Sequence, residues 1–383
     1  MKTQKIKVCH FSSVHSIYDT RVFERECVWL AKYYDVTLIA IGNFKGTKNG
    51  VKIIGVKKTS KPWHRFFSNV WIVFAKAIKT NAKIYHIHDA ELLPFALLLK
   101  IFGKKVFYDI HENTKADIIY KTWVPDWQKR ILIGFYDLLL RLSSKYIHFI
   151  PVVWKPDDAE IFHCKPNNFT IVQNFADIEI LRKFRVENRE LLPENNIFYI
   201  GMLKDMYYDI YKLFDAMLLL KQEGINTHLH CVGYFGIGEN DDFKYYKKWN
   251  EVKDLVSYYG KLNFMDAYEI SKECKVGICL KNQPEGMVVS HERKLFEYMA
   301  IGLPAIYCNA SIYIDISEKY QSGICCNLEN PFEIKEALKL LFLDKNLSFQ
   351  ISKNQIKISD KEINWQKEFN KLLISYQSEF VSI

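Results

Sequence analysis

The sequence lacks any apolar run long enough to cross a lipid bilayer. Its longest apolar stretch, ILIGFYDLLL at 131–140, is about half the length of a membrane-spanning helix and is followed by an arginine. The first residues, MKTQKIKVCHFSS, contain no long apolar segment of the kind found in signal peptides. No internal repeat at a solenoid period is visible. These absences predict a folded protein without a membrane span, a leader peptide or a repeat architecture.

The nine cysteines include no CxxC pair and no second cluster at zinc-binding spacing. Most of them lie in apolar, strand-like runs, such as Cys9 in IKVCHF and Cys231 in HLHCVG. We therefore expect buried, reduced thiols, which indicate the cytoplasm, and we predict no metal site.

The composition predicts two domains. At 383 residues with 49% hydrophobic and 15% aromatic residues, the chain exceeds the size at which one core usually stops growing.

The charge is unevenly distributed along the chain. Residues 1–175 carry 27 Lys and Arg against 14 Asp and Glu, whereas residues 176–383 carry 26 Lys and Arg against 30 Asp and Glu. The first half is therefore expected to face an anionic partner, either a phosphorylated substrate or an acidic membrane surface. Nucleic acid is disfavoured because no RNP, helix-turn-helix or zinc motif accompanies the charge.

Short apolar runs alternate with helical patterns in both halves, which predicts parallel sheets covered on both faces. Predicted strands lie at 6–11, 35–41, 51–56, 83–88, 105–110, 146–152, 196–201, 227–233, 257–262, 275–280, 303–308 and 323–328. Predicted helices lie at 21–33, 66–80, 91–102, 126–143, 209–222, 266–274, 292–302, 330–343 and 362–380.

This α/β pattern lapses into a polar linker around 175–195. We predict a doubly wound N-terminal domain at 1–175, joined by a C-terminal helix at about 362–383, and a second Rossmann-like domain at 190–360. The two would face a central cleft, with ligands bound beyond the carboxyl ends of the strands.

The most distinctive segment is HERKLFEYMAIGLP at 291–304. If it is helical, Lys294 and Glu297 project from one face near the N-terminus, where free N–H groups favour a diphosphate. Lys294 would add a full positive charge, and Glu297 would accept hydrogen bonds from ribose hydroxyls. The alternative is a solvated Lys–Glu pair on a surface helix.

This segment resembles the K-L-F-E-Y-M-A-x-G-x-P stretch of GT-B glycosyltransferases of family 4, the retaining enzymes that use nucleotide sugars. Three further segments resemble that family in the same order: HFSSVH through DTRVF at 10–23, HIHDAELLP at 86–94 and YDIHE at 108–112. Together the matches span roughly residues 6–310. The C-terminal helix with Trp365 resembles the helix that crosses back to the first domain.

The resemblance implies a GT-B fold and assigns residues to two sites. His111 would lie beside the transferred sugar and, with Glu297, form the catalytic pair. The second domain would hold the donor through a further set of residues: Gly201, Lys204, Asn263, Phe264, Val288, Val289, Ser290 and Lys294. No cofactor and no metal are implied, because the donor phosphate itself would help to take the acceptor proton.

The acceptor is expected at strand ends of the first domain. Its predicted contacts are Asp19, Arg21, His88, Asp89 and Glu112. Asp19 and Asp89 also stand where a helix N-cap is expected, and both roles remain open. For His111 the alternative is a side chain satisfied by local backbone.

Two departures from the family pattern concern the donor site. Val289 stands where many members carry a second glutamate, and Tyr207 lies where we expect a phosphate-binding arginine. Lys204 or Lys212 is expected to substitute for the arginine.

Two segments combine basic and aromatic residues in a way that fits a membrane surface. They are 57–79, with Trp63, Phe66, Phe67, Trp71 and Phe74, and 119–145, with Trp123, Trp127 and a Leu-rich helix. The alternative is that these aromatic side chains belong to the core.

The sequence thus predicts a retaining, metal-independent glycosyltransferase. It would move a sugar from a UDP- or GDP-sugar to a glycan or lipid-linked acceptor, as in surface polysaccharide synthesis. It would be cytoplasmic and peripherally bound to the anionic inner face of the cell membrane. The alternatives are a nucleotide-sugar epimerase of similar fold and a degenerate, non-catalytic scaffold subunit.

Overall fold

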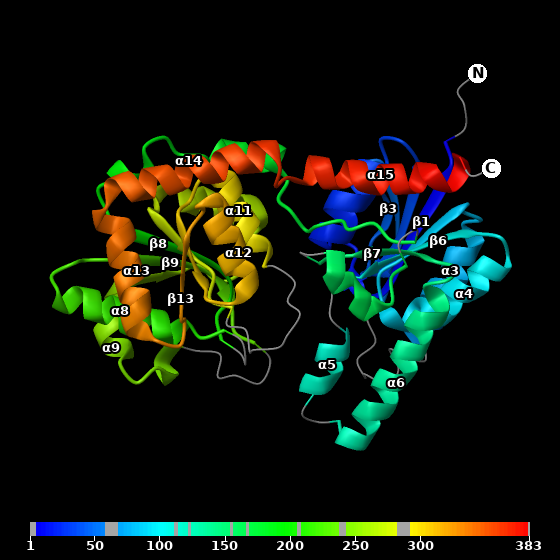
Figure 1. The fold of residues 1–383 in the computed structure, drawn as a ribbon, viewed down its shortest axis with the longest axis horizontal. Coiled ribbons are helices and arrows are strands. Elements are labelled where there is room, and N and C mark those ends of the chain that lie inside the picture. Colours follow the sequence, from blue (N-terminus) through cyan, green and yellow to red (C-terminus); the bar gives the residue numbers. More distant parts are fainter. Residues whose placement is uncertain are drawn as a thin grey trace. The chain divides into compact units, whose positions relative to one another are not determined.

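The structure, a computed structural model, describes residues 5–57, 68–110, 114–121, 124–153, 156–165, 168–204, 208–236, 243–281 and 292–381. The chain divides into two compact units, each built around its own sheet (Figure 1). Unit 1 comprises Met1–Asn174 together with Trp365–Ile383, and unit 2 comprises Phe175–Asn364. The first change of unit thus falls at the start of the polar stretch that we took as the linker.

The sheet of unit 1 has seven strands in the order β3-β4-β2-β1-β5-β6-β7. All neighbouring pairs are parallel except β3 and β4, which form an antiparallel pair at one edge. The strands are β1 (Lys7–Ser16), β2 (Asp35–Ile41), β3 (Lys45–Lys48), β4 (Val51–Val56), β5 (Ile84–Ile87), β6 (Lys105–Ile110) and β7 (His148–Pro151).

Both faces of this sheet are covered, as the uninterrupted apolar strands predict. Cys9 and Phe11 of β1 pack into a core with α3 (Val70–Lys79), α4 (Leu93–Ile101) and α6 (Asp126–Ser143). Val8, on the opposite face, packs into a second core. That core is built with the π-helical segment η1 (Thr20–Cys27) and with α15 (Trp365–Val381).

The C-terminal helix α15 belongs to unit 1, although the helix before it, α14 (Lys345–Lys361), belongs to unit 2. Trp365, Phe369, Leu372 and Tyr376 of α15 are all at most 2% exposed and lie in the second core. Their spacing of four, three and four residues places them on one face of the helix. The prediction of a C-terminal helix that returns to the first domain is confirmed.

The sheet of unit 2 has six parallel strands in the order β10-β9-β8-β11-β12-β13. They are β8 (Asn196–Met202), β9 (His228–Tyr234), β10 (Val256–Tyr258), β11 (Val276–Ile278), β12 (Ala305–Cys308) and β13 (Ile324–Cys326). The main helices around it are α8 (Ile210–Gln222), α10 (Phe264–Ile270), α11 (Arg293–Ile301), α12 (Ser311–Tyr320), α13 (Pro331–Leu343) and α14. Helix α8 packs on α13, and α11 packs on α14.

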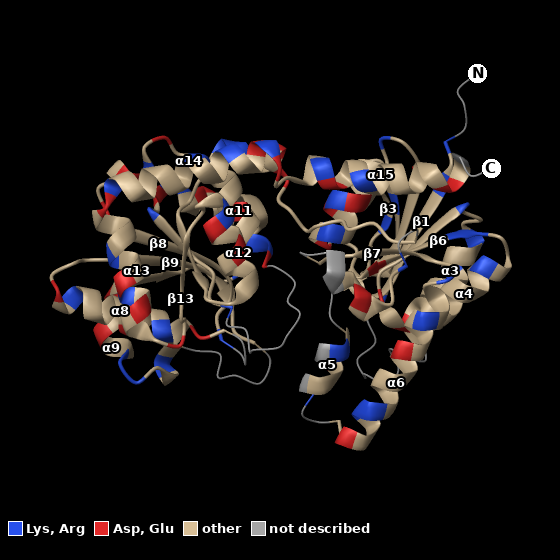
Figure 2. Cartoon of the chain, in the orientation of Figure 1, with Lys and Arg blue, Asp and Glu red and all other residues tan. Residues whose placement is uncertain are grey.

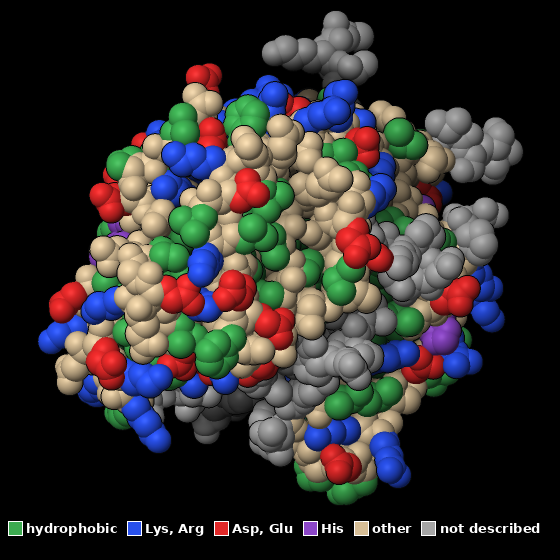
Figure 3. Space-filling view, turned by 60° about the vertical axis from the view of Figure 1, so that its left-hand side comes forward, with side chains coloured by type: hydrophobic (Ala, Val, Ile, Leu, Met, Phe, Trp, Pro, Cys, Tyr) green, Lys and Arg blue, Asp and Glu red, His purple; other side chains and the backbone are tan. Residues whose placement is uncertain are grey.

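The remaining general predictions concern cysteines and membranes. All nine cysteines are free thiols, and seven of them are buried. Within the described part of the chain, no helix is both long enough and apolar enough to span a membrane. On the face drawn in Figure 3, acidic, basic and apolar side chains are interspersed.

Candidate functional site

The topology of unit 2 predicts a ligand site at the carboxyl end of β8. The chain builds β8, β9 and β10 in one direction and then returns to place β11 on the other side of β8. In open parallel sheets, ligands bind where the strand order reverses in this way. Gly201 lies at this point, near the end of β8, with a φ of +140° that side-chain-bearing residues rarely adopt.

Lys294 reaches this point from the first turn of α11. A Cβ atom added to Gly201 would lie 2.6 Å from Lys294 Nζ, so the absence of a side chain at Gly201 makes room for the ammonium group. The residue is 9% exposed, and its Nζ lies 4.6 Å from the centre of the Tyr199 ring and 5.1 Å from that of Tyr208. Among the described residues, no atom accepts a hydrogen bond from Nζ.

One carboxylate balances part of this charge. Glu292, the N-cap residue of α11, holds its Oε1 atom 3.5 Å from Lys294 Nζ and accepts a hydrogen bond of 2.5 Å from the Tyr208 hydroxyl. The ion pair is longer than a direct N–H···O bond, so no described residue accepts any of the three ammonium protons. The site therefore combines a buried cation with the N-terminal end of a nine-residue helix, two features that attract an anion.

Glu297 is also buried, at 2% exposure, but its carboxylate points to other partners. Tyr268 of α10 donates a 2.5 Å hydrogen bond to Oε2, and Arg293 Nε lies 2.7 Å from Oε1. Burial, and then the nearby Glu297 charge, raise the pKa of Tyr268 well above its usual value. Lys294 and Glu297 thus occupy an enclosed helix, and the alternative of a solvated surface pair is wrong.

The C-terminal end of α11 is defined by Gly302 and packs against α14. Gly302 adopts a left-handed conformation with a φ of +64°, and Leu303 N donates to Tyr298 O at 3.0 Å, which closes the helix. A Cβ atom at Gly302 would lie 2.7 Å from Ile356 of α14. The glycine therefore serves both the helix terminus and close helix packing.

The other described donor residues lie around the same unit. Lys204 Nζ lies 4.4 Å from the centre of the Tyr211 ring and 3.7 Å from Asp209 Oδ2, partly exposed after β8. Asn263 caps α10 by accepting a 3.0 Å hydrogen bond from Asp266 N, and Phe264 packs on Tyr268 at 4.7 Å between ring centres. Both roles are structural contacts within α10.

Comparison with known protein families identifies the domain that contains these residues. The family model described as glycosyl transferases group 1 matches residues 182–358, which covers nearly all of unit 2. The chain carries a glycosyltransferase group 1 domain. No curated protein sequence matches the chain.

Solved structures extend the likeness of this glycosyltransferase to the whole fold. Sucrose-phosphate synthase from Thermosynechococcus elongatus has a TM-score of 0.72 at 13% identity, covering 98% of this chain and 99% of that chain. HepE from Anabaena, in complex with UDP-glucose, has a TM-score of 0.70 at 12% identity, with coverage of 97% and 100%. WaaG, a glycosyltransferase involved in lipopolysaccharide biosynthesis, has a TM-score of 0.68 at 13% identity, with coverage of 95% and 98%. The predicted GT-B fold is confirmed.

The first unit of the glycosyltransferase has its own reversal of strand order, between β1 and β5. Here Asp89, just after β5, accepts hydrogen bonds from Ser13 N at 2.6 Å and from Ser13 Oγ at 3.2 Å. His15 Nε2 lies 3.5 Å from Asp89 Oδ1, and His15 Nδ1 lies 3.6 Å from Asp19 Oδ2. Asp89 therefore binds the C-terminal part of β1 through Ser13 and His15. Its side chain makes no capping hydrogen bond to the following turn.

Asp19 and Arg21 make different contacts, Asp19 with backbone N–H groups of η1 and Arg21 with a buried carboxylate. Asp19 caps η1, because its Oδ1 accepts from Arg21 N and Val22 N, each at 2.9 Å. The Arg21 guanidinium is buried and binds Asp109 through two hydrogen bonds, Nε at 2.8 Å and Nη2 at 2.7 Å. Asp109 thus faces Arg21 inside unit 1. The capping role of Asp19 is observed, and acceptor contacts by either residue stay a prediction.

His88 is the centre of a buried polar network. Its Nε2 lies 3.0 Å from His10 Nδ1, and its Nδ1 lies 3.3 Å from Asp109 Oδ2. The Tyr376 hydroxyl of α15 joins the network through His10 Nε2 at 3.1 Å and His86 Nδ1 at 2.7 Å. Burial, and then neighbouring histidines, lower the pKa of His10 and His86 well below the usual value. These imidazoles are therefore neutral at pH 7.

Several predicted residues lie outside the described part of the chain: His111, Glu112, Tyr207, Val288, Val289 and Ser290. Conversely, Tyr199, Tyr268 and Glu292 lie near Lys294 and Glu297 in the structure but were not predicted from the sequence. Glu292 stands two residues before Lys294, the first residue of the KLFEYMA motif, at the N-cap position of the helix, and this position was the available signal. Tyr199 and Tyr268 are distant from Lys294 and Glu297 in the sequence, and the fold brings them into contact.

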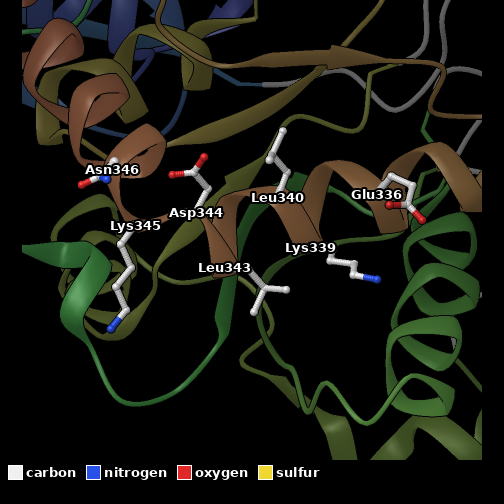
Figure 4. A pocket seen from close by; sticks show the side chains of 7 residues that line it. All are labelled: Glu336, Lys339, Leu340, Leu343, Asp344, Lys345 and Asn346. Atoms are coloured by element: carbon white, nitrogen blue, oxygen red, sulfur yellow. The ribbon is translucent and has the colours of Figure 1, made fainter.

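A hollow elsewhere in unit 2 is separate from these residues. Figure 4 shows it along α13 and the start of α14, lined by Glu336, Lys339, Leu340, Leu343, Asp344, Lys345 and Asn346. None of these residues contributes to the Lys294 site.

Proposed function

We propose that this glycosyltransferase transfers a sugar, with retention of configuration, from a UDP- or GDP-sugar to a glycan or lipid-linked acceptor at the cytoplasmic face of a membrane. The single observation that carries the donor assignment is the buried Lys294 ammonium beside Gly201. It lies where the strand order reverses, and no described atom accepts its hydrogen bonds.

The chemistry of a diphosphate fits this ammonium. Burial of an ammonium group is costly, and the carboxylate recorded beside it among the described residues lies 3.5 Å away, so phosphate oxygens would replace the water that the group has lost. In the transition state, negative charge develops on the departing diphosphate, so a fixed cation stabilises it more than the ground state. Lys294 would thereby supply positive charge at the diphosphate, and we propose no metal there.

Glu297 is proposed to bind the ribose of the donor. Its two oxygens each have further acceptor capacity beyond their contacts with Tyr268 and Arg293. These two partners orient the carboxylate before a ligand arrives, which reduces the entropy lost on binding. UDP is included because HepE, a protein of this fold, has been solved with UDP-glucose.

The acceptor proposal comes from α6. One side of this helix carries a stripe of apolar side chains that are 42–64% exposed, namely Trp127, Ile131, Leu132, Phe135, Leu138 and Leu142. Figure 1 shows α6 extending away from the sheet of unit 1, and Figure 2 shows that charged residues occupy only part of its length. Such an apolar stripe with nearby Lys129, Arg130, Arg141 and Lys145 is typical of helices that lie in the interface of an anionic membrane.

The other segment proposed for the membrane is less exposed where it is described. Phe74 is 5% exposed and belongs to the core, whereas Trp71 is 60% exposed and packs edge-on against Phe95. Positions 58–67 lie outside the described residues. Helix α6 is therefore the main element of the proposed membrane surface.

Thermal unfolding against UDP, GDP, ADP and their common sugars tests the donor site. A ligand that binds only the native state at a hundredfold excess over its Kd stabilises it by about 2.7 kcal/mol. We expect a shift with one nucleotide family, lost in Lys294→Met and kept in the control Lys353→Met on the exposed side of α14. Absence of any shift in the unaltered protein would sink the proposal. Product analysis then separates transfer with retention from epimerisation of the donor.

A further inference from the structure

We infer that unit 1 contains a buried zinc site formed by His10, Glu26, His86 and His88. One nitrogen or oxygen ligand atom from each of these residues lies within 4.8 Å of the others, and all four side chains are buried. They come from three separate elements, β1, η1 and the β5 region, so the site would join segments up to 78 residues apart in the chain.

Three of the atoms already form a triangle of nearly the right size. His10 Nδ1 and His88 Nε2 are 3.0 Å apart, and Glu26 Oε2 lies 3.7 Å from the first and 3.9 Å from the second. Around tetrahedral zinc, with bonds of about 2.0–2.2 Å, ligand atoms are about 3.3–3.5 Å apart. Shifts of a few tenths of an ångström would therefore bring all three into coordination.

The outward nitrogens of the histidines are occupied in the manner of metal-bound imidazoles. His88 Nδ1 faces Asp109 Oδ2 at 3.3 Å, while His10 Nε2 and His86 Nδ1 both contact the Tyr376 hydroxyl. Partners of this kind set the tautomer and orientation of zinc ligands. His86 Nε2 is left buried, with no hydrogen-bond partner in the described structure.

The burial of Glu26 is a further reason to place a cation at this site. Its side chain is 0% exposed, and neither carboxylate oxygen accepts a hydrogen bond from any described residue. The nearest cation is Arg21, whose Nε lies 3.3 Å from Oε1 but is hydrogen-bonded to Asp109. Arg21 therefore faces two buried carboxyl groups, Glu26 and Asp109, and a divalent ion would supply a second positive charge.

Zinc suits this donor set better than magnesium or calcium, which prefer oxygen ligands. Four protein ligands in an enclosed site are typical of structural rather than catalytic zinc. The metal would fasten β1, β5 and η1 together and, through Tyr376, orient α15. This site is independent of the donor site in unit 2.

Refolding the full chain tests the inference, because an enclosed site takes up metal most readily during folding. Protein unfolded in guanidinium with chelator is refolded with zinc or with magnesium, gel-filtered and analysed for metal. We expect about one zinc per chain, a higher Tm than after refolding with magnesium, and more than tenfold less zinc in His86→Gln and Glu26→Gln. The control His230→Gln, a histidine of unit 2 bonded to Tyr259, should retain it.

Cobalt(II) provides a readout that needs no variant, since the unaltered protein should show the intense visible absorption of four-coordinate cobalt. Six-coordinate absorption, less than a tenth of an equivalent of zinc, or equal zinc in both variants and the control would overturn the site. A UDP-dependent thermal shift in metal-free protein is expected to persist, so failure here and failure of the donor proposal are distinguishable.

Discussion

At the scale of single residues, the proposed donor site depends on the absence of a side chain at Gly201 as much as on the presence of Lys294. Gly201 gives Lys294 Nζ its position, because any Cβ there would lie 2.6 Å from the ammonium nitrogen. Lys294 is part of a recognisable motif. Gly201 lies 93 positions earlier in the sequence, and only the fold brings it next to the Lys294 ammonium.

Gly201→Ala is therefore predicted to weaken nucleotide binding at least about tenfold, which is about 1.4 kcal/mol. The matched control is Gly224→Ala in the same unit, where φ is also positive at +78° but nothing lies within 4 Å of the added Cβ. Both substitutions should lower stability by about 1–3 kcal/mol through backbone strain. Titration calorimetry with the nucleotide separates the two effects, and equal affinities in the two variants would refute the role of Gly201.

The Arg21–Asp109 pair is the second residue-scale feature with a measurable consequence. Both side chains are buried, and Asp109→Asn removes the charge of the carboxylate that binds the guanidinium through two hydrogen bonds, so we predict a loss of about 3–5 kcal/mol in the unfolding free energy of unit 1. The same substitution at Asp137 of α6, which pairs with Lys115 and Arg141 near the surface, should cost about 0–1 kcal/mol. Urea unfolding measures both, and similar costs would contradict the argument.

At the scale of elements, α6 presents an apolar stripe to the outside while its opposite side is buried through Tyr136 and Leu140. The stripe positions 127, 131, 135, 138 and 142 follow helical spacing, so they form one continuous ridge. A single charge placed on the ridge should therefore act on membrane binding without disturbing the core.

Phe135→Glu is predicted to reduce binding to vesicles that contain anionic lipid at least about fivefold, since it removes an aromatic ring from the interface and adds a repelled charge. Gln128→Glu adds the same charge to α6 beside the ridge and should change binding about twofold or less. Vesicle co-sedimentation of both variants decides the matter. If the unaltered protein does not bind such vesicles, the membrane surface is wrong.

Elements also differ in how far the sequence could reveal them. The strands were predictable because parallel strands buried on both faces are almost uniformly apolar. Helix α14 was not predicted, because its buried face consists largely of Ser348, Ser352, Gln355 and Ser359 rather than apolar residues. Two of these polar side chains donate to backbone carbonyls, Ser352 Oγ to Gly302 O at 2.8 Å and Gln355 Nε2 to Ser322 O at 2.6 Å.

At the scale of the whole molecule, the sequence predicted both sheets, the return of the last helix and the Lys294–Glu297 motif. It did not predict which distant groups meet. Arg21 and Asp109 are 88 residues apart, and Tyr376 contacts His10 across 366 residues. Periodicity reports which face of an element is buried but carries no information about contacts at such separations.

The crossing of the chain from unit 2 back to unit 1 leads to a prediction about the intact protein. Each unit has its own sheet and core, but unit 1 is completed only by α15. Ending the chain at Asn364 would remove Trp365, Phe369, Leu372 and Tyr376 from that core. At about 1.5–3 kcal/mol for each large buried side chain, the loss is comparable to the total stability of a domain.

We therefore predict two unfolding transitions in calorimetry of the full chain, of which the nucleotide raises only the one that belongs to unit 2. The chain that ends at Asn364 should lose the transition of unit 1 and keep the nucleotide-dependent one, because Gly201, Lys294 and Glu297 lie within Phe175–Asn364. A chain that ends after Val381 is the control and should behave as the full protein does. Loss of the nucleotide-dependent transition on removal of α15 would mean that unit 2 does not fold around its own core, and that the donor site depends on residues beyond it.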